Sequence, residues 1–148
     1  MKTKYLFLVL MLITLTSKAQ DLSKYEKSIF ISKNDTLPYR ILFPEKFDAS
    51  KKYPLILVLH GAGERGSDNE AQLTHGGSLF LNQNLRSSFP AIVVFPQCPK
   101  SSYWSNVKIE RDEAGKPLTF DFQKRGKPTE AMAALLGLTD RLLEKTLC

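Results

Sequence analysis

The segment with the clearest chemical meaning is His60-Gly61-Ala62-Gly63, which directly follows the apolar run 54–59. A buried strand that ends in His-Gly-x-Gly leaves backbone N–H groups pointing into a pocket. Such groups can hold the negative oxygen of the tetrahedral intermediate in acyl transfer. The segment therefore predicts half of an acyl-transfer site. The competing interpretation is a tight strand-to-loop turn that binds no ligand.

The nucleophile that such chemistry needs is not found in the sequence. No Gly-x-Ser-x-Gly motif follows the turn before Cys148. The stretch Gly76-Gly77-Ser78-Leu79-Phe80 comes closest, but it lacks the final glycine that a strand-to-helix elbow requires. We expect solvated or capping roles for the nearby serines, which are Ser67, Ser78, Ser101, Ser102 and Ser105.

Two apolar runs must position the turn. Residues 55–59 do not alternate with polar residues, which predicts a central strand covered on both faces in a parallel or mixed sheet. Residues 91–95 predict a second buried strand, closed by Pro96. Upstream, residues 29–31 and 39–43 are rich in β-branched and aromatic residues and flank the turn-forming pair Asn34-Asp35, so they predict an antiparallel hairpin.

The remaining segments differ in periodicity. Residues 64–84 are polar, with one weakly helical stretch at 70–74 and a break at Gly76-Gly77. Residues 97–128 show no clear period and predict a long loop around Tyr103 and Trp104, which either shape a pocket or cover the edge of the core. Leucines at helical spacing predict an amphipathic helix over 130–144, with Thr129 as its N-cap and Glu130 favoured by the helix dipole.

With these elements in place, the chain resembles the α/β-hydrolase superfamily. Within it, the chain is most similar to secreted carboxylesterase/phospholipase-like proteins described as predicted peptidases, related to dienelactone hydrolases and polyhydroxybutyrate depolymerases. The resemblance extends over residues 25–145 and is carried by three segments: Tyr53-Pro54 through Gly66-Ser67-Asp68, Gln72-Leu73-Thr74-His75-Gly76, and Pro96-Gln97-Cys98-Pro99 with Trp104. It implies an α/β fold, specifically the N-terminal half of an α/β-hydrolase fold. That half consists of an antiparallel hairpin and parallel central strands flanked by helices, and it ends before the nucleophile elbow.

The resemblance also implies a function and a site. The chain is expected to be the N-terminal portion of a secreted serine hydrolase that acts on carboxylic esters. One oxyanion donor would come from the backbone of Ala62 or Gly63, with His60 and Gly61 supporting the turn. All three members of the Ser-Asp-His triad would lie beyond residue 148, so the chain by itself is predicted to be inactive. No cofactor or metal is implied, and the substrate, a small-molecule or polymeric ester, stays open.

Other polar residues near the turn have less specific interpretations. We expect His60 to be structural rather than a general base, and His75 to be a polar loop residue. The acids Glu64, Asp68 and Glu70 match no defensible metal motif together with His75, so solvation and N-capping by Asp68 are the preferred roles. Arg65 would either pair with one of these acids or meet a substrate carboxylate.

The first nineteen residues predict a cleaved signal peptide, because Lys2 and Lys4 precede the apolar run 5–15 and small residues follow it. The run is too short for a stable membrane anchor, since a spanning helix needs about 20 apolar residues. The mature chain would then be a partial hydrolase domain, residues 20–148, that is secreted or periplasmic. Cleavage lowers the formal net charge from +6 to +3, and the basic pairs in loops do not indicate a nucleic-acid partner.

The pairing of the cysteines, the state of association and the alternatives to a hydrolase stay open from the sequence. The only cysteines are Cys98 and Cys148, and their spacing does not decide whether they form a disulfide. We also expect an exposed apolar sheet edge that promotes self-association. An alternative function is a non-catalytic secreted binding module built on the same half-sheet, and a third possibility is an incomplete reading of a longer gene.

Overall fold

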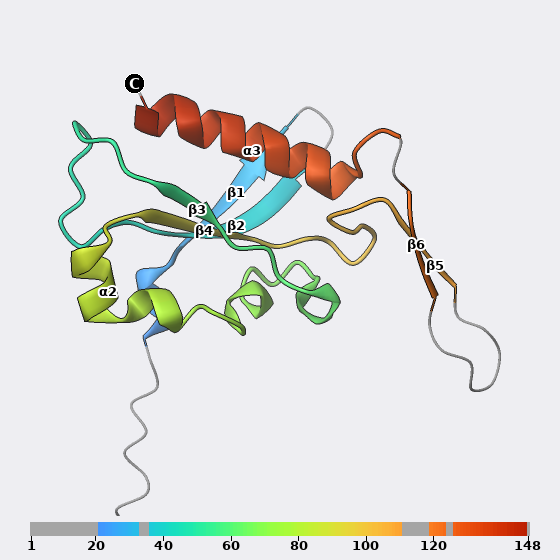
Figure 1. Cartoon of the computed structure of the whole chain (residues 1–148), viewed down its shortest axis with the longest axis horizontal. Coiled ribbons are helices and arrows are strands. Elements are labelled where there is room, and N and C mark those ends of the chain that lie inside the picture. Colours follow the sequence, from blue (N-terminus) through green and yellow to red (C-terminus); the bar gives the residue numbers. More distant parts are fainter. Residues whose placement is uncertain (1–20, 33–35, 111–118, 124–125, 148) are drawn as a thin grey trace, which may run out of the picture.

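Strand β4 (Ile92–Pro96) lies at the centre of the fold (Figure 1). The computed structural model describes residues 21–32, 36–110, 119–123 and 126–147. A four-stranded sheet has the order β1-β2-β4-β3, where β1 is Glu26–Ile31, β2 is Thr36–Leu42 and β3 is Leu55–Leu57. Strand β2 pairs antiparallel with both β1 and β4, and β3 runs parallel to β4. This mixed sheet is consistent with the predicted α/β class, and the hairpin β1–β2 is confirmed; its Asn34-Asp35 turn lies outside the described residues.

All five side chains of β4 are buried. Because consecutive side chains point to opposite sides of the sheet, both faces of the strand are covered. One face packs under helix α3 (Glu130–Leu147), and helix α2 (Gln83–Ser88) and the short 3₁₀ turns lie on the other side (Figure 1). The α3 side contains Phe30, Leu37, Ile41, Ile92, Val94, Ala134, Leu135, Leu138 and Leu142. The opposite side contains Tyr25, Leu42, Leu73, Val93 and Phe95.

Helix α3 begins where the sequence predicted it. The Oγ1 of Thr129 accepts a hydrogen bond from the amide of Met132 at 3.1 Å, as an N-cap does. The same hydroxyl donates to the carbonyl of Tyr103 at 2.6 Å. The cap therefore ties the start of α3 to the segment that follows β4.

Strand β3 differs from its prediction. The expected central strand over 55–59 is a three-residue strand at the sheet edge, Leu55–Leu57, and its side chains are only half-buried. Leu59 lies beyond it and is exposed. An apolar run indicates that both faces of a strand can be covered. It does not indicate which strands pair with it on either side. Within the described residues, β4 is the only strand that pairs with β3.

The predicted loop 97–128 is also wrong in part. It contains an antiparallel hairpin of β5 (Val107–Glu110) and β6 (Thr119–Phe122), which stands beside the main sheet (Figure 1). Both strands alternate apolar and polar residues, which is the period of a strand with one apolar face. Each run is only four residues long, which is too short for the alternation to predict a strand with certainty from the sequence. The weakly helical stretch expected at 70–74 is the 3₁₀ turn Ala71–Leu73, and helix α2 forms over residues for which the sequence made no prediction.

Two sequence predictions concern residues that the structure does not describe in full. Residues 1–19, the predicted signal peptide, lie outside the described residues. Across the described part of the chain, no helix combines the length and apolar composition needed to cross a bilayer. Cys98 is a buried free thiol, and Cys148 lies outside the described residues.

Candidate functional site

The turn after β3 leaves two backbone donors without partners. Gly61 is extended, with φ −79° and ψ −173°, and the next residues form the 3₁₀ helix η2 (Ala62–Glu64). The first N–H groups of a helix have no acceptor inside that helix. In the described part of the chain, no other group accepts a hydrogen bond from the amide of Ala62 or Gly63. Two adjacent N–H groups are therefore available to an external acceptor.

His60 links this turn to the end of β4. Its Nε2 accepts a hydrogen bond from the amide of Cys98 at 2.9 Å, and its Nδ1 lies 2.6 Å from the carbonyl of Gly61. The hydrogen-bond pattern assigns the proton to Nδ1, since Nε2 must act as an acceptor. The indole N–H of Trp104 donates to the His60 carbonyl at 3.2 Å, and the two rings meet edge to face. Both ring nitrogens are thus engaged with backbone groups, which argues against a general-base role.

Arg65 connects the turn to the segment 100–103. Its Nε donates to the carbonyl of Ala62 at 3.1 Å, and its Nη1 donates to the carbonyls of Lys100 and Ser102 at 3.2 and 3.0 Å. The guanidinium also lies 3.9 Å above the ring of Tyr103. Within the described residues Arg65 forms no ion pair, so its partners are backbone carbonyls and a ring rather than the acids considered from the sequence.

A buried polar network holds the loop that follows η2. The Oε1 of Gln97 accepts from the amide of Asn69 at 2.7 Å, and its Nε2 donates to the Glu64 carbonyl at 3.2 Å and to Asp68 Oδ1 at 2.9 Å. The buried Arg40 donates from Nε to the carbonyl of Asn69 at 2.6 Å. Asn69 has φ 54°, a left-handed conformation that asparagine tolerates better than most residues. The end of η2 is therefore fixed to β2 and β4.

Sequence reasoning missed the contributions of Gln97, Arg40 and Asn69. Arg40 did offer a signal, because a single cation lies among the apolar residues of a predicted strand. A charge in such a place is buried only when it is paired or hydrogen-bonded. Its hydrogen-bond partners are the carbonyls of Tyr25 and Asn69, which lie 15 and 29 residues away, so local patterns do not identify them.

The acids near the turn form caps and ion pairs. Hydrogen bonds from the amides of Ala71 and Glu70, and then from Gln97, hold the pKa of Asp68 below its usual value. Glu70 pairs with Lys27 at 2.6 Å, and this contact lowers the pKa of Glu70. His75 Nε2 lies 3.3 Å from Glu64. Among the described residues, no group of three or more His, Cys, Asp or Glu side chains is arranged to hold a metal ion.

A cavity of about 400 Å³ opens beside the turn. Three segments enclose it: the glycine turn, the stretch that follows β4, and the β5–β6 hairpin. Its lining consists of His60, Gly61, Ala62, Arg65, Cys98, Tyr103, Trp104, Ser105, Val107, Ile109, Phe120 and Phe122. Of the serines considered from the sequence, Ser105 lines this cavity, and no hydrogen bond joins it to a histidine in the described residues.

Cys98 contributes a second feature of this cavity wall. The residue is fully buried, and burial raises the pKa of its thiol to about 11, while the nearby Arg65 acts in the opposite direction. A thiol in this state carries little thiolate near neutral pH and is a weak nucleophile. The cavity therefore holds backbone donors and apolar walls, but no activated nucleophile among the described residues.

Comparison with known proteins shows which solved structure this fold resembles. A solved crystal structure of a thermostable esterase superposes with a TM-score of 0.66 and 27% sequence identity. The match covers 84% of this chain and 32% of the esterase chain. The fold is hydrolase-like. No family model and no curated protein sequence matches the chain.

The share of each chain covered matters for function. The chain spans about a third of the length of that esterase, so the likeness concerns one part of a larger hydrolase. The relationship is therefore to hydrolases at a coarse level.

Proposed function

We propose that this chain supplies the oxyanion turn of a secreted serine hydrolase that acts on carboxylic esters. The amides of Ala62 and Gly63 would donate to the oxygen that becomes negative when the ester carbonyl is attacked. The serine nucleophile and its acid and base would come from a segment outside these 148 residues. The chain alone would then bind the acyl group without cleaving it.

One observation carries this proposal: two adjacent, unpartnered amides lie at the tip of β3, and Ala62 lines a cavity large enough for a small ester. Amide donors held in place before reaction cost no reorganisation when charge develops. Here the fixing groups are His60, Arg65 and Gln97, which bind the backbone on both sides of the two amides. The esterase likeness supports the same chemistry.

The decisive experiment removes one donor and leaves the backbone unchanged. In Ala62→Pro the N–H is lost, and proline is well suited to the first position of a helix. Gly61 already has the extended conformation that a residue before proline prefers. In the gene product that includes the nucleophile, we expect kcat for p-nitrophenyl acetate to fall by about 10²–10³, with KM nearly unchanged.

Ala62→Gly is the matched control, because it alters the side chain and keeps the N–H. It should retain kcat within about threefold, and both variants should melt near the parent temperature. An A62P enzyme with unchanged kcat would exclude Ala62 as an oxyanion donor. A fluorophosphonate probe should label the nucleophile-containing product and leave the 148-residue chain unlabelled. Labelling of the shorter chain would contradict the assignment of the nucleophile to another segment.

A further inference from the structure

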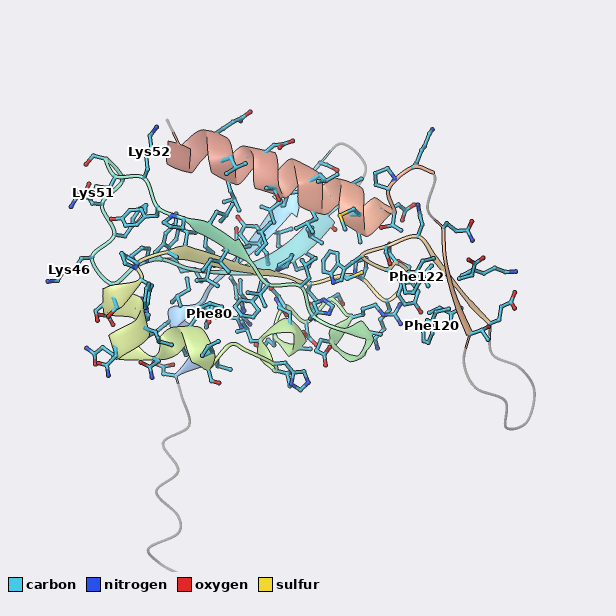
Figure 2. All side chains as sticks on the ribbon, in the orientation of Figure 1. Lys46, Lys51, Lys52, Phe80, Phe120 and Phe122 are labelled. Atoms are coloured by element: carbon cyan, nitrogen blue, oxygen red, sulfur yellow. The ribbon has the colours of Figure 1, made fainter. Side chains whose placement is uncertain are left out.

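The hairpin β5–β6 presents one apolar face. Cross-strand partners Val107–Phe122 and Ile109–Phe120 share that face. Phe120 and Phe122 are 55% and 61% exposed, and their rings are nearly parallel, 18° apart, with centroids separated by 6.5 Å. Figure 2 shows both side chains projecting from β6 toward the main body of the protein. Two large aromatic rings therefore stay open to solvent on the inner side of the hairpin.

The opposite face of the same hairpin is polar. Lys108 and Glu110 alternate with Val107 and Ile109 along β5, and they form an exposed ion pair at 2.5 Å. An apolar and a polar face on one hairpin give it a defined orientation, with the rings directed inward.

The inner face continues into the cavity beside the glycine turn. Phe120 and Phe122 line the same cavity as Ala62 and Trp104. A ligand whose carbonyl oxygen reached the Ala62 amide would extend its remaining atoms along the hairpin. The apolar face thus lies where one side of an ester would be bound.

The charge that the cavity favours in a ligand depends on Arg65 and on the side chains around it. Arg65 is the cation among the cavity-lining residues, and it is already bound to the carbonyls of Ala62, Lys100 and Ser102 and to the ring of Tyr103. These contacts occupy Nε and Nη1 and leave the positive charge in place, but the other side chains that line the cavity are mainly aromatic or aliphatic and suit an uncharged group. The lining therefore favours an uncharged ligand.

We propose that the β5–β6 hairpin is the specificity wall of the site, and that Phe120 and Phe122 bind the aromatic group of an uncharged aryl ester. This inference rests on the proposed function, and it adds the substrate class. Flat aryl groups stack on parallel or offset aromatic rings, and the two rings are nearly parallel, with centroids 6.5 Å apart, so a flat group can stack against their faces.

The chain contains its own reporter for this site. Trp104 is the only tryptophan in the sequence, and it lines the cavity. 4-Bromophenyl acetate is an uncharged aryl ester whose bromine quenches tryptophan fluorescence on contact. Titrated into the full chain, it should quench Trp104 saturably. Phe120→Thr/Phe122→Thr should raise the apparent Kd by about tenfold or more, because two apolar contact surfaces are lost. Threonine keeps the β propensity of the strand.

Three controls keep the test specific. Lys108→Thr changes the polar face, and Phe89→Thr removes another strongly exposed phenylalanine that lies outside this cavity; both should retain the parent Kd. Phe120→Tyr/Phe122→Tyr keeps the rings and should bind within about threefold of the parent. If the tyrosine variant also loses binding, ring stacking is not the source of affinity and the proposal is wrong.

The outcomes separate this inference from the proposed function. Quenching that is unaffected by the threonine variant, or equally strong with the anion 4-bromobenzoate, would overturn the aryl-ester assignment whatever A62P does to kcat. Conversely, quenching that depends on Phe120 and Phe122 would uphold the wall even if A62P left kcat unchanged. In the catalytic gene product, the threonine variant should raise KM for aryl esters, whereas Phe89→Thr should leave that KM unchanged.

Discussion

In the turn that follows β3, His60 connects three parts of the chain: its imidazole bonds its own turn and the residue after Gln97, and its carbonyl accepts from the indole of Trp104. A histidine next to a candidate oxyanion turn invites a catalytic assignment. The hydrogen bonds point to a different role, because the ring accepts from one backbone amide and contacts one backbone carbonyl. Its contribution is to fix where the turn lies relative to β4.

This role makes a stability prediction for a single residue. In His60→Phe, the amide of Cys98 loses its acceptor, and an unsatisfied buried donor costs about 1–3 kcal/mol. In His60→Gln, the side-chain carbonyl can replace Nε2 as the acceptor. We therefore expect urea denaturation to show a lower midpoint for H60F than for H60Q. Equal midpoints would mean that the bond to Cys98 contributes nothing measurable to folding.

At the scale of elements, Asp68 is the residue on which the loop 64–72 is organised. Its Oδ1 accepts from the amides of Glu70 and Ala71, at 2.7 and 2.9 Å, and from Gln97. These bonds stabilise the ionised form, so the folded-state pKa lies below the unfolded value. The contribution of Asp68 is therefore fully present above the unfolded pKa, near 3.9, and is lost as pH falls through the lowered folded-state pKa.

Asp68→Ala should accordingly lower the free energy of unfolding by about 0.5–2 kcal/mol at pH 7, the usual cost of removing such a cap. The difference from the parent should shrink below pH 4, because the parent carboxylate then takes up a proton. Asp68→Asn keeps a capping oxygen without charge and should lie between the two at pH 7. Chemical denaturation between pH 7 and pH 3 measures all three. A constant difference across this range would show that the carboxylate charge has no part in the effect.

Which elements were predictable follows from how far each depends on distant partners. Helix α3, the hairpin β1–β2 and β4 all have strong local periodicity, and the structure confirms them. The hairpin β5–β6 has the same kind of signal in two short runs that eight undescribed residues separate, and the sequence prediction missed it. Strand β3 was expected to be a central strand and lies at the edge of the described sheet. An apolar run specifies the burial of a strand and not its neighbours.

The candidate site divides along the same line. The position of the turn was predictable, because four consecutive residues define it. The bonds that hold it and the loop after it were not, because they come from Gln97, just after β4, and from Arg40 in β2, which are distant in sequence. The aromatic wall of the cavity was equally hidden, since Phe120 and Phe122 approach the turn only through the tertiary arrangement.

For the whole molecule, the exposed edge of β3 is the feature with the widest consequences. The amide of Val58 donates to Val94, and the Pro54 carbonyl accepts from Ile92, so these groups face β4. Because N–H direction alternates along a strand, the amides of Leu55 and Leu57 face away from β4. No strand pairs with that side among the described residues. A parallel edge with apolar flanks is a template for another strand.

We therefore expect the 148-residue chain to self-associate through β3. Sedimentation velocity should show an average mass that rises with concentration between about 5 and 200 μM, the range in which exposed edges of this kind promote association. Hydrogen exchange supplies an internal control: the amide of Val58 should be protected at every concentration, and those of Leu55 and Leu57 should gain protection only as the mass rises. A chain that stays monomeric, with Leu55 and Leu57 exchanging freely at high concentration, would show that this edge is tolerated in water, and that the half-sheet is stable enough to act as a binding module on its own.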